Sequence, residues 1–222
     1  MLAYGTIASS GILSNMSQAI LSTERLCLLP LSPEHLALQV ELDADPEVMR
    51  HLGGSRSRSQ AEAALRANLA DAERVPGLGS WVGFVADEFV GYWILRPPGY
   101  TDEDLVEGCA ELGCKILRRH WRKGLGSEGS RELLRHGFED LGLHRVAAMA
   151  TAANAASRAT LTGLGLLLVR EFEADADDFP PGSDLRAVEL AITLEDWKAG
   201  AENPHAQPPD GDFTPVTERL SP

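Results

Sequence analysis

The segment HWRKGLGSEGSRELLRHGF, residues 120–138, places three glycines at the start of an amphipathic run. A glycine turn that opens a helix can bind an anion, because its backbone N–H groups have no partner in the helix and the helix dipole adds about half a positive charge. Small residues also let the backbone approach a ligand closely. The segment therefore predicts a phosphate-binding turn, and the chemistry of the protein depends on which phosphate the turn holds.

The three glycines also match GxGxxG, the pattern of dinucleotide-binding proteins, but their surroundings do not fit it. A Rossmann strand runs directly into its first glycine, and an acidic residue that binds the ribose follows about 20 residues later. Here LRRHWRK separates the expected strand 109–116 from the first glycine, and RVAAMATAAN, at the later offset, contains no acidic residue. A P-loop is excluded because the sequence has no GK[ST].

Basic side chains crowd this turn in a chain that is otherwise acidic, namely Arg118, Arg119, Arg122 and Lys123. Such an island favours a phosphate ligand, although a solvated surface patch is the alternative interpretation. The formal net charge of −13 argues against nucleic acid as a partner, because its phosphates would be repelled. The same charge suits a cationic partner such as an amine, or serves solubility alone.

The composition, with 44% hydrophobic and 24% charged residues in 222, is that of a soluble globular protein with one large domain. No apolar stretch approaches the roughly 20 residues of a membrane-spanning helix. We expect a flexible leader over 1–21, a domain over 22–199 and a disordered tail over 200–222. The leader lacks the positive n-region of a secretory signal, and Met16 is an alternative start of the chain. Three cysteines without a CxxC pair predict no disulfide or zinc site and a cytoplasmic location.

Hydrophobic patterning predicts a mixed α/β fold. Strands are expected at 24–31, 80–86, 89–95, 109–116, 144–150, 166–174 and 185–193, and helices at 33–42, from 46, at 59–73, 127–141 and 154–165. A capping box of Ser59 and Glu62 is expected to start the third helix. The order of these elements implies a mostly antiparallel sheet with a central parallel strand-helix-strand unit over 109–150.

Residues 110–165, together with LSTERLCLLPLSPEHLALQVELDADPEVMRHLGG near the start and LEDW near the end, resemble the GNAT N-acetyltransferases. Within that superfamily they are most similar to the RimJ/RimL-like group, which acetylates protein N-termini and other amines. The resemblance covers roughly residues 22–197. It implies a GNAT-like seven-stranded sheet with flanking helices, acetyl-CoA as cosubstrate, no metal, and relatives that often form homodimers.

The resemblance also assigns the glycine turn. It implies that residues 121–126 bind the diphosphate of CoA, and that Asn154 and Ser157, which match the group's Asn-x-x-Ser, lie beside the pantetheine arm. The implied cofactor-binding set is Leu117, Arg118, Arg119, Trp121, Arg122, Lys123, Gly124, Leu125, Gly126, Ser127, Asn154, Ser157 and Arg158. Three features depart from the group: Leu166 replaces the usual Phe, Thr162-Gly163 replaces a charged pair, and the 154–165 helix has no Tyr to serve as general acid.

The catalytic candidates follow from the same resemblance. Glu111 matches the group's Ala-Glu-Leu-Gly segment on the strand beside the thioester, and it is the candidate base that deprotonates the amine. The alternative is a structural ion pair or an exposed carboxylate. Ser157 is the candidate acid, or it orders a water that acts as the acid; the alternative is an ordinary hydroxyl in the first turn of a helix.

Two further features, a cysteine and an acidic segment, are weaker candidates for a functional role. Cys114 could carry an acetyl group, but without an evident base partner it is expected to be a packed strand cysteine. The acidic segment DADD, residues 175–178, either borders the acceptor groove and attracts a cationic amine or serves solubility. The predicted function is an acetyl-CoA-dependent amine N-acetyltransferase; the alternatives are a non-catalytic acyl-CoA-binding regulatory module and, least favoured, a nucleotide-dependent oxidoreductase.

Overall fold

The computed structural model describes residues 18–98 and 107–202. The leader expected over 1–21 and the tail expected over 200–222 therefore lie largely outside the described residues. Where they can be checked, both expected boundaries fall inside an element, because Leu21 belongs to a short strand and the last helix continues to Glu202. No helix among the described residues combines the length and the apolarity that a membrane span requires.

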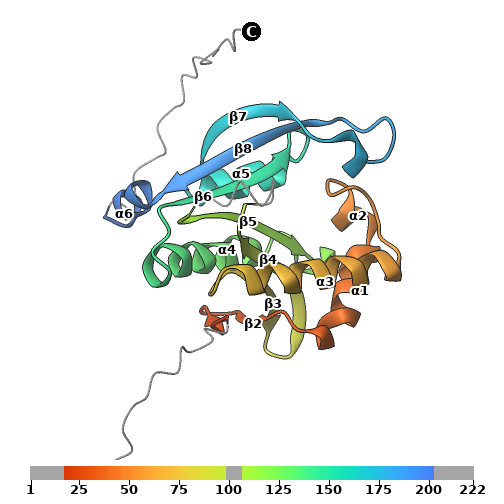
Figure 1. Ribbon diagram of the computed structural model, residues 1–222, viewed down its shortest axis with the longest axis horizontal. Helices are drawn as coiled ribbons and strands as arrows, with labels where there is room; N and C mark the ends of the chain where they lie inside the picture. Colours follow the sequence, from red (N-terminus) through yellow and green to blue (C-terminus); the bar gives the residue numbers. More distant parts are fainter. Residues whose placement is uncertain (1–17, 99–106, 203–222) are drawn as a thin grey trace, which may run out of the picture.

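A single open sheet of eight strands forms the centre of the molecule, in the order β1-β2-β3-β4-β5-β6-β8-β7 (Figure 1). The strands are β1 (Leu21–Ser22), β2 (Cys27–Pro30), β3 (Gly79–Val85), β4 (Glu88–Arg96), β5 (Cys109–Ile116), β6 (Arg145–Thr151), β7 (Leu167–Glu173) and β8 (Arg186–Thr193). Every neighbouring pair is antiparallel except β5 and β6, which are parallel. This confirms the predicted fold class, with one strand more than the seven expected.

The additional strand is β1, which pairs with β2 through two residues, Leu21 with Leu28 and Ser22 with Cys27. A two-residue strand has no detectable alternation, so its sequence could not reveal it. The turn that follows, residues 23–26, closes with a bond from the Thr23 N–H to the Leu26 carbonyl at 2.9 Å.

Helices cover both faces of the sheet. Successive residues of each strand point to opposite faces and therefore pack against different helices. Val82 and Tyr92 pack on one side with Leu42 and Leu65 from the helices there, whereas the neighbouring Trp93 packs on the other. The first layer holds η1 (Pro33–His35), α1 (Leu36–Ala44), α2 (Pro46–Met49) and α3 (Arg58–Arg74). The second holds α4 (Leu125–Arg135), the π-turn η4 (His136–Asp140) and α5 (Ala155–Gly163), and α6 (Leu194–Glu202) follows β8.

Helix starts agree with the sequence in part. Asn154 caps α5 as expected, accepting the Ser157 N–H at 3.1 Å, and Asp45 caps α2. The capping box of α3 is formed by Ser57 and Gln60, two residues earlier than the predicted pair. The two pairs have the same spacing and equivalent chemistry, so the sequence alone does not distinguish them.

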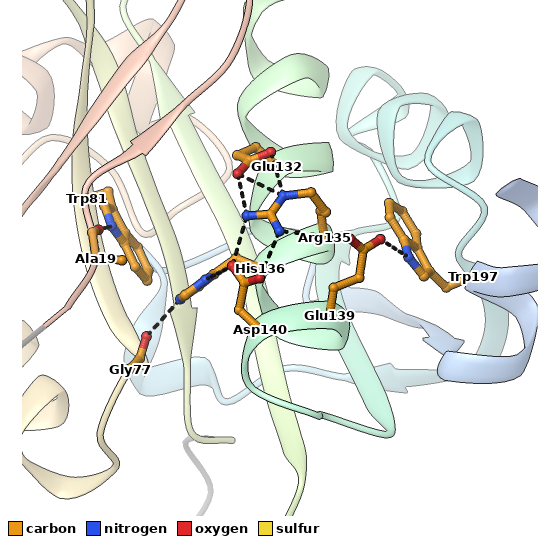
Figure 2. Close-up of polar contacts among 9 residues, drawn as sticks. All are labelled: Ala19, Gly77, Trp81, Glu132, Arg135, His136, Glu139, Asp140 and Trp197. Carbon is orange, nitrogen blue, oxygen red and sulfur yellow. Dashed lines mark hydrogen bonds and ion pairs between the residues drawn. The ribbon is translucent and has the colours of Figure 1, made fainter. Parts of the chain in front are cut away.

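The helix expected over 127–141 is α4 continued by one π-turn, and a polar cluster holds this end of it (Figure 2). Arg135 binds Glu132 at 2.8 Å and Asp140 at 2.9 Å, and His136 Nδ1 lies 2.9 Å from Asp140. The Trp197 indole, from α6, donates to Glu139 at 3.2 Å. These contacts fix the C-terminal end of α4, and the glycine turn forms its other end.

Candidate active site

Strands β5 and β6 part soon after they pair. Their parallel register covers only Cys109 to Glu111 against Arg145 to Ala147. Beyond it β5 stays hydrogen-bonded to β4 as far as Ile116, and β6 stays bonded to β8 as far as Thr151. Residues 112–116 and 148–151 therefore face each other without pairing, and we call the space between them the strand gap.

A short 3-10 helix separates the glycine turn from the end of β5. After η3 (Arg118–His120) the backbone turns through two left-handed residues, Arg122 with φ of 59° and Gly124 with φ of 76°, and α4 begins at Leu125. Within the part of the chain that the structure describes, the backbone N–H groups of residues 122–127 donate no hydrogen bond. We call these six residues the anion loop, because free N–H groups at a helix N-terminus are suited to bind an anion.

The three glycines have different physical roles. Gly124 supplies the left-handed conformation of the N-cap. A β-carbon at Gly126 would lie 3.5 Å from Ile116 and 3.7 Å from Cys114, at ordinary contact distance on the side of β5. A β-carbon at Gly129 would lie 2.6 Å from the Trp93 ring, so this glycine is needed for packing. The match to GxGxxG is thus a coincidence of packing and loop geometry.

Side-chain donors from other elements bind carbonyl groups of the anion loop. The buried Trp93 indole donates to the Gly126 carbonyl at 3.3 Å, and Arg25 donates to the Lys123 carbonyl at 3.0 Å. Trp121 donates to the Ile116 carbonyl at 2.7 Å and stays 40% exposed. Sequence reasoning missed Arg25 and Trp93, since both lie far from the turn in the chain and no spacing connects them to it.

The basic island divides in two. Arg122 and Lys123 are exposed on the anion loop, but Arg119 binds Glu41 at 2.8 Å and Glu88 at 3.2 Å. The bond to Glu41 raises the pKa of the Arg119 guanidinium. Arg118 lines a surface cavity of about 520 Å³ together with Glu41 and Asp45. Both arginines thus lie on the α1 side of the sheet, and their contact with the cofactor stays a prediction.

The other rim of the strand gap is the start of α5. Asn154 follows the end of β6, and its side-chain oxygen is used by the Ser157 N–H. Arg158 donates to the Ala152 carbonyl at 3.1 Å and so closes the same turn. The structure thus places the predicted Asn154, Ser157 and Arg158 together, at the end of the strand that faces β5 across the gap.

Glu111 lies where the gap begins, as the last residue of β5 that pairs with β6. Its carboxylate accepts from Arg96 at 3.2 Å, which is the ion pair that the sequence left open as an alternative. It also lines a cavity of about 540 Å³ with Met149, Arg170 and Glu189. Because Glu111 alternates with the core residue Ala110, it points to the face of the sheet opposite α5, so the structure does not bring Glu111 and Ser157 together directly.

The loop of residues 50–57, between α2 and α3, is attached to both strands of the gap. His51 Nδ1 lies 3.2 Å from the Thr151 hydroxyl at the end of β6. On the β5 side Lys115 binds the fully buried Asp43, which also pairs with Arg56 at 3.5 Å. Burial lowers the pKa of Lys115, although Asp43 opposes that change. No pattern in the sequence indicated these tertiary contacts.

The same loop also contacts the segment between β7 and β8, which contains the short η5 (Ala176–Asp178). A β-carbon at Gly54 would lie 3.6 Å from Pro180, and Figure 1 shows α2 and the β7–β8 turn at the same end of the molecule. The loop of residues 50–57 therefore lies near the segment that includes the acidic residues 175–178.

All three cysteines are free thiols, and Cys114 is exposed at the strand gap. The residue is exposed because β5 and β6 part there, but its thiol is turned toward the start of α4, where burial raises the pKa of the thiol. A packed cysteine without an activating base stays a prediction. Cys109, two positions before Glu111, is the buried one.

Comparison with known proteins agrees with this architecture. Residues 25–167 match the family model described as the acetyltransferase (GNAT) domain. The chain is 39% identical over 185 residues to the FsC-acetyl coenzyme A-N(2)-transacetylase of Aspergillus fumigatus, across 82% of this chain and 79% of that protein. The GNAT-family acetyltransferase of Bacillus anthracis superposes with a TM-score of 0.65 at 19% identity, over 80% and 99% of the two chains.

A second solved structure, the alpha-N-protein acetyltransferase RimL in complex with coenzyme A, superposes with a TM-score of 0.66 at 14% identity, over 80% of this chain and 99% of that one. These likenesses establish the fold, and the family model together with the Aspergillus relative establishes the family. The chain therefore belongs to the GNAT acetyltransferases and is an acetyl-CoA-dependent acetyltransferase.

Proposed function

We propose that this enzyme transfers the acetyl group to a primary amine, which attacks the thioester directly in a ternary complex, as a member of the RimJ/RimL-like group. The observation that carries the proposal is the run of six free N–H groups, residues 122–127, which follows η3 beyond the end of β5, the strand that has parted from β6 after Glu111. If the diphosphate of CoA binds to those groups, the thiol arm of the cofactor can extend along the strand gap.

The residues present fit acetyl-CoA. The anion loop offers N–H donors and two exposed cations, Arg122 and Lys123, to the diphosphate. The strand gap offers unpaired strand edges, whose N–H and C=O groups can bond to the amides of the pantetheine arm. Asn154 and Ser157, which form the first turn of α5 after β6, would lie beside the arm on that side.

The amine must lose a proton before it attacks. α-Amino groups titrate near 8 and lysine amines near 10.4, so more basic amines depend more on a base. We assign this role to Glu111 at the beginning of the gap, and protonation of the departing thiolate to Ser157 or to a water that it orders. A backbone N–H of β5 beyond Glu111 is suited to stabilise the oxyanion.

The acceptor class rests on a relative and on charge. The name of the Aspergillus protein specifies transfer to a nitrogen, N(2), of its acceptor. The net charge of −13 and the acidic segment 175–178 favour a cationic amine. By contrast, the carboxylates Glu111 and Glu189 in the cavity are each already paired with arginine. A cytoplasmic location and a homodimer belong to the same proposal.

Thiol release from acetyl-CoA, measured against N-terminal peptides, polyamines and aminoglycosides, tests this function. We expect at least one amine to accelerate release above hydrolysis and to yield the N-acetylated product. Initial-rate lines should intersect, as a ternary complex requires, and Cys114→Ala should retain activity. Parallel lines with an inactive Cys114→Ala variant would contradict direct attack, and no acceleration by any amine class would contradict the amine acceptor.

A further inference from the structure

Arg25, in the turn between β1 and β2, contacts the anion loop and the first turn of α4 at once. Its Nε donates to Glu128 at 2.6 Å, and its Nη1 donates to the Lys123 carbonyl at 3.0 Å. Its backbone N–H donates to the other Glu128 oxygen at 3.0 Å, and the Thr23 hydroxyl donates to that same oxygen. We call Thr23, Arg25 and Glu128 the brace.

The bond to the Lys123 carbonyl determines where the next N–H points. No peptide bond among the described residues is cis, and in a trans peptide the C=O of one residue and the N–H of the next point in opposite directions. Because Arg25 holds the Lys123 carbonyl, the Gly124 N–H is directed away from the brace. This orients a donor of the anion loop before any ligand arrives.

The loop needs such support because its conformation is unfavourable on its own. Arg122 adopts φ of 59°, a left-handed conformation that is unfavourable for a residue with a side chain. Glu128 adds a second difficulty, since a carboxylate in the first turn of α4 would repel a diphosphate held there. Arg25 pairs with that carboxylate, with the two side chains 46% and 19% exposed, and offsets its charge.

We infer that Arg25 is a positioning residue of the cofactor site, which orients the anion loop through the Lys123 carbonyl and which Glu128 holds in place. The inference rests on the proposed function, because it assumes that the loop binds a diphosphate. It gives the acidic Glu128 a favourable part in binding an anion. It also explains why the fold includes β1 and its turn, which position Thr23 and Arg25 against α4.

Calorimetric titrations with CoA and with pantetheine, which carries the thiol arm without phosphates, test the inference on Arg25→Ala. We expect the CoA dissociation constant to rise about tenfold or more, as for loss of a charged hydrogen bond, and the pantetheine constant to change less than about twofold. Arg66→Ala, which removes an equivalent exposed arginine paired with Glu62 on α3, is the matched control and should bind both as the wild type does. Equal losses for both ligands, or unchanged CoA binding, would overturn the inference.

Glu128→Ala separates the brace from simple electrostatics. If Arg25 only attracted phosphate, removal of the nearby carboxylate would tighten CoA binding, whereas the brace requires weaker binding, because Arg25 loses its anchor. Tighter or unchanged binding would therefore overturn the inference, even if Arg25→Ala behaved as expected. Failure of the wild-type protein itself to bind CoA would instead refute the proposed function.

Discussion

At Gly129 a β-carbon would lie 2.6 Å from the buried Trp93 ring, whereas at Gly126 its nearest neighbour would be 3.5 Å away. This difference predicts that Gly129→Ala destabilises the fold, by about 1–3 kcal/mol for an overpacked core. Urea unfolding measures that loss. CoA binding by the folded fraction should weaken as well, because the displaced Trp93 indole is the donor to the Gly126 carbonyl of the anion loop. An undiminished stability would contradict the packing role.

Glu111 can be tested against its own ion pair. If it is the base, Glu111→Gln should lower kcat about 10²- to 10⁴-fold with a basic amine. Arg96→Gln breaks the same pair but keeps the carboxylate, so kcat should fall much less. Rate measurements on both variants decide the role: equal, small effects would leave Glu111 as a structural ion pair.

Sequence reasoning at this scale found residues near one another in the chain and missed those brought together by folding. The turn 121–127 and Asn154 with Ser157 could be located because local spacing and a family resemblance mark them. Arg25, Trp93 and His51 could not, because each reaches the site from an element that is distant in the chain. The ion pairs of Arg119 with Glu41 and Glu88 could not be predicted either, because these partners come from other elements.

At the scale of elements, α4 is fixed at its C-terminal end by charge. The bond with Arg135, aided by one with His136, lowers the pKa of Asp140 from its ordinary 3.8 to about 2. A carboxyl group whose pKa is lower in the folded state stabilises the fold above its unfolded pKa, and that stabilisation is lost as the pH falls through the folded value.

Asp140→Asn should therefore be less stable than the wild type at pH 7, by up to about 1 kcal/mol for a partly exposed pair. The difference should shrink as the pH falls from 3.8 toward about 2, where wild-type Asp140 also becomes neutral. Chemical unfolding of both proteins across this range measures it. The difference in stability should be smaller when Arg135 is also replaced by Gln. A difference in stability that persists unchanged at pH 2 would contradict the ion pair.

Elements with strong periodicity could be predicted, and their ends could not. Strands β3 to β6 and helix α5 lie close to where hydrophobic patterning predicts them. The predicted capping box was two residues late, and the helix expected over 127–141 begins at Leu125 and ends in a π-turn. Alternative caps with similar chemistry, and a change in helix type stabilised by tertiary contacts, leave no trace in periodicity.

For the whole molecule, the order of elements and the resemblance together predicted a mostly antiparallel sheet with one parallel pair, and the structure confirms it. What could not be predicted is how the sheet brings loops together. The segment 50–57 is linked to β5 through Asp43, which binds Lys115, and to β6 through a bond with Thr151. It also lies near Pro180 in the β7–β8 segment. Such convergence depends on three-dimensional packing, and no spacing within the chain encodes it.

One measurement tests the central claim, that the N–H groups of residues 122–127 hold the diphosphate of CoA. It is calorimetric titration with CoA of the wild type, Gly126→Ala and Gly126→Asp. A methyl group at 126 meets only ordinary contacts, so the alanine variant should bind as the wild type does. The aspartate places a negative charge beside the diphosphate and should weaken binding at least about 100-fold. Wild-type affinity in a folded Gly126→Asp protein would contradict the account.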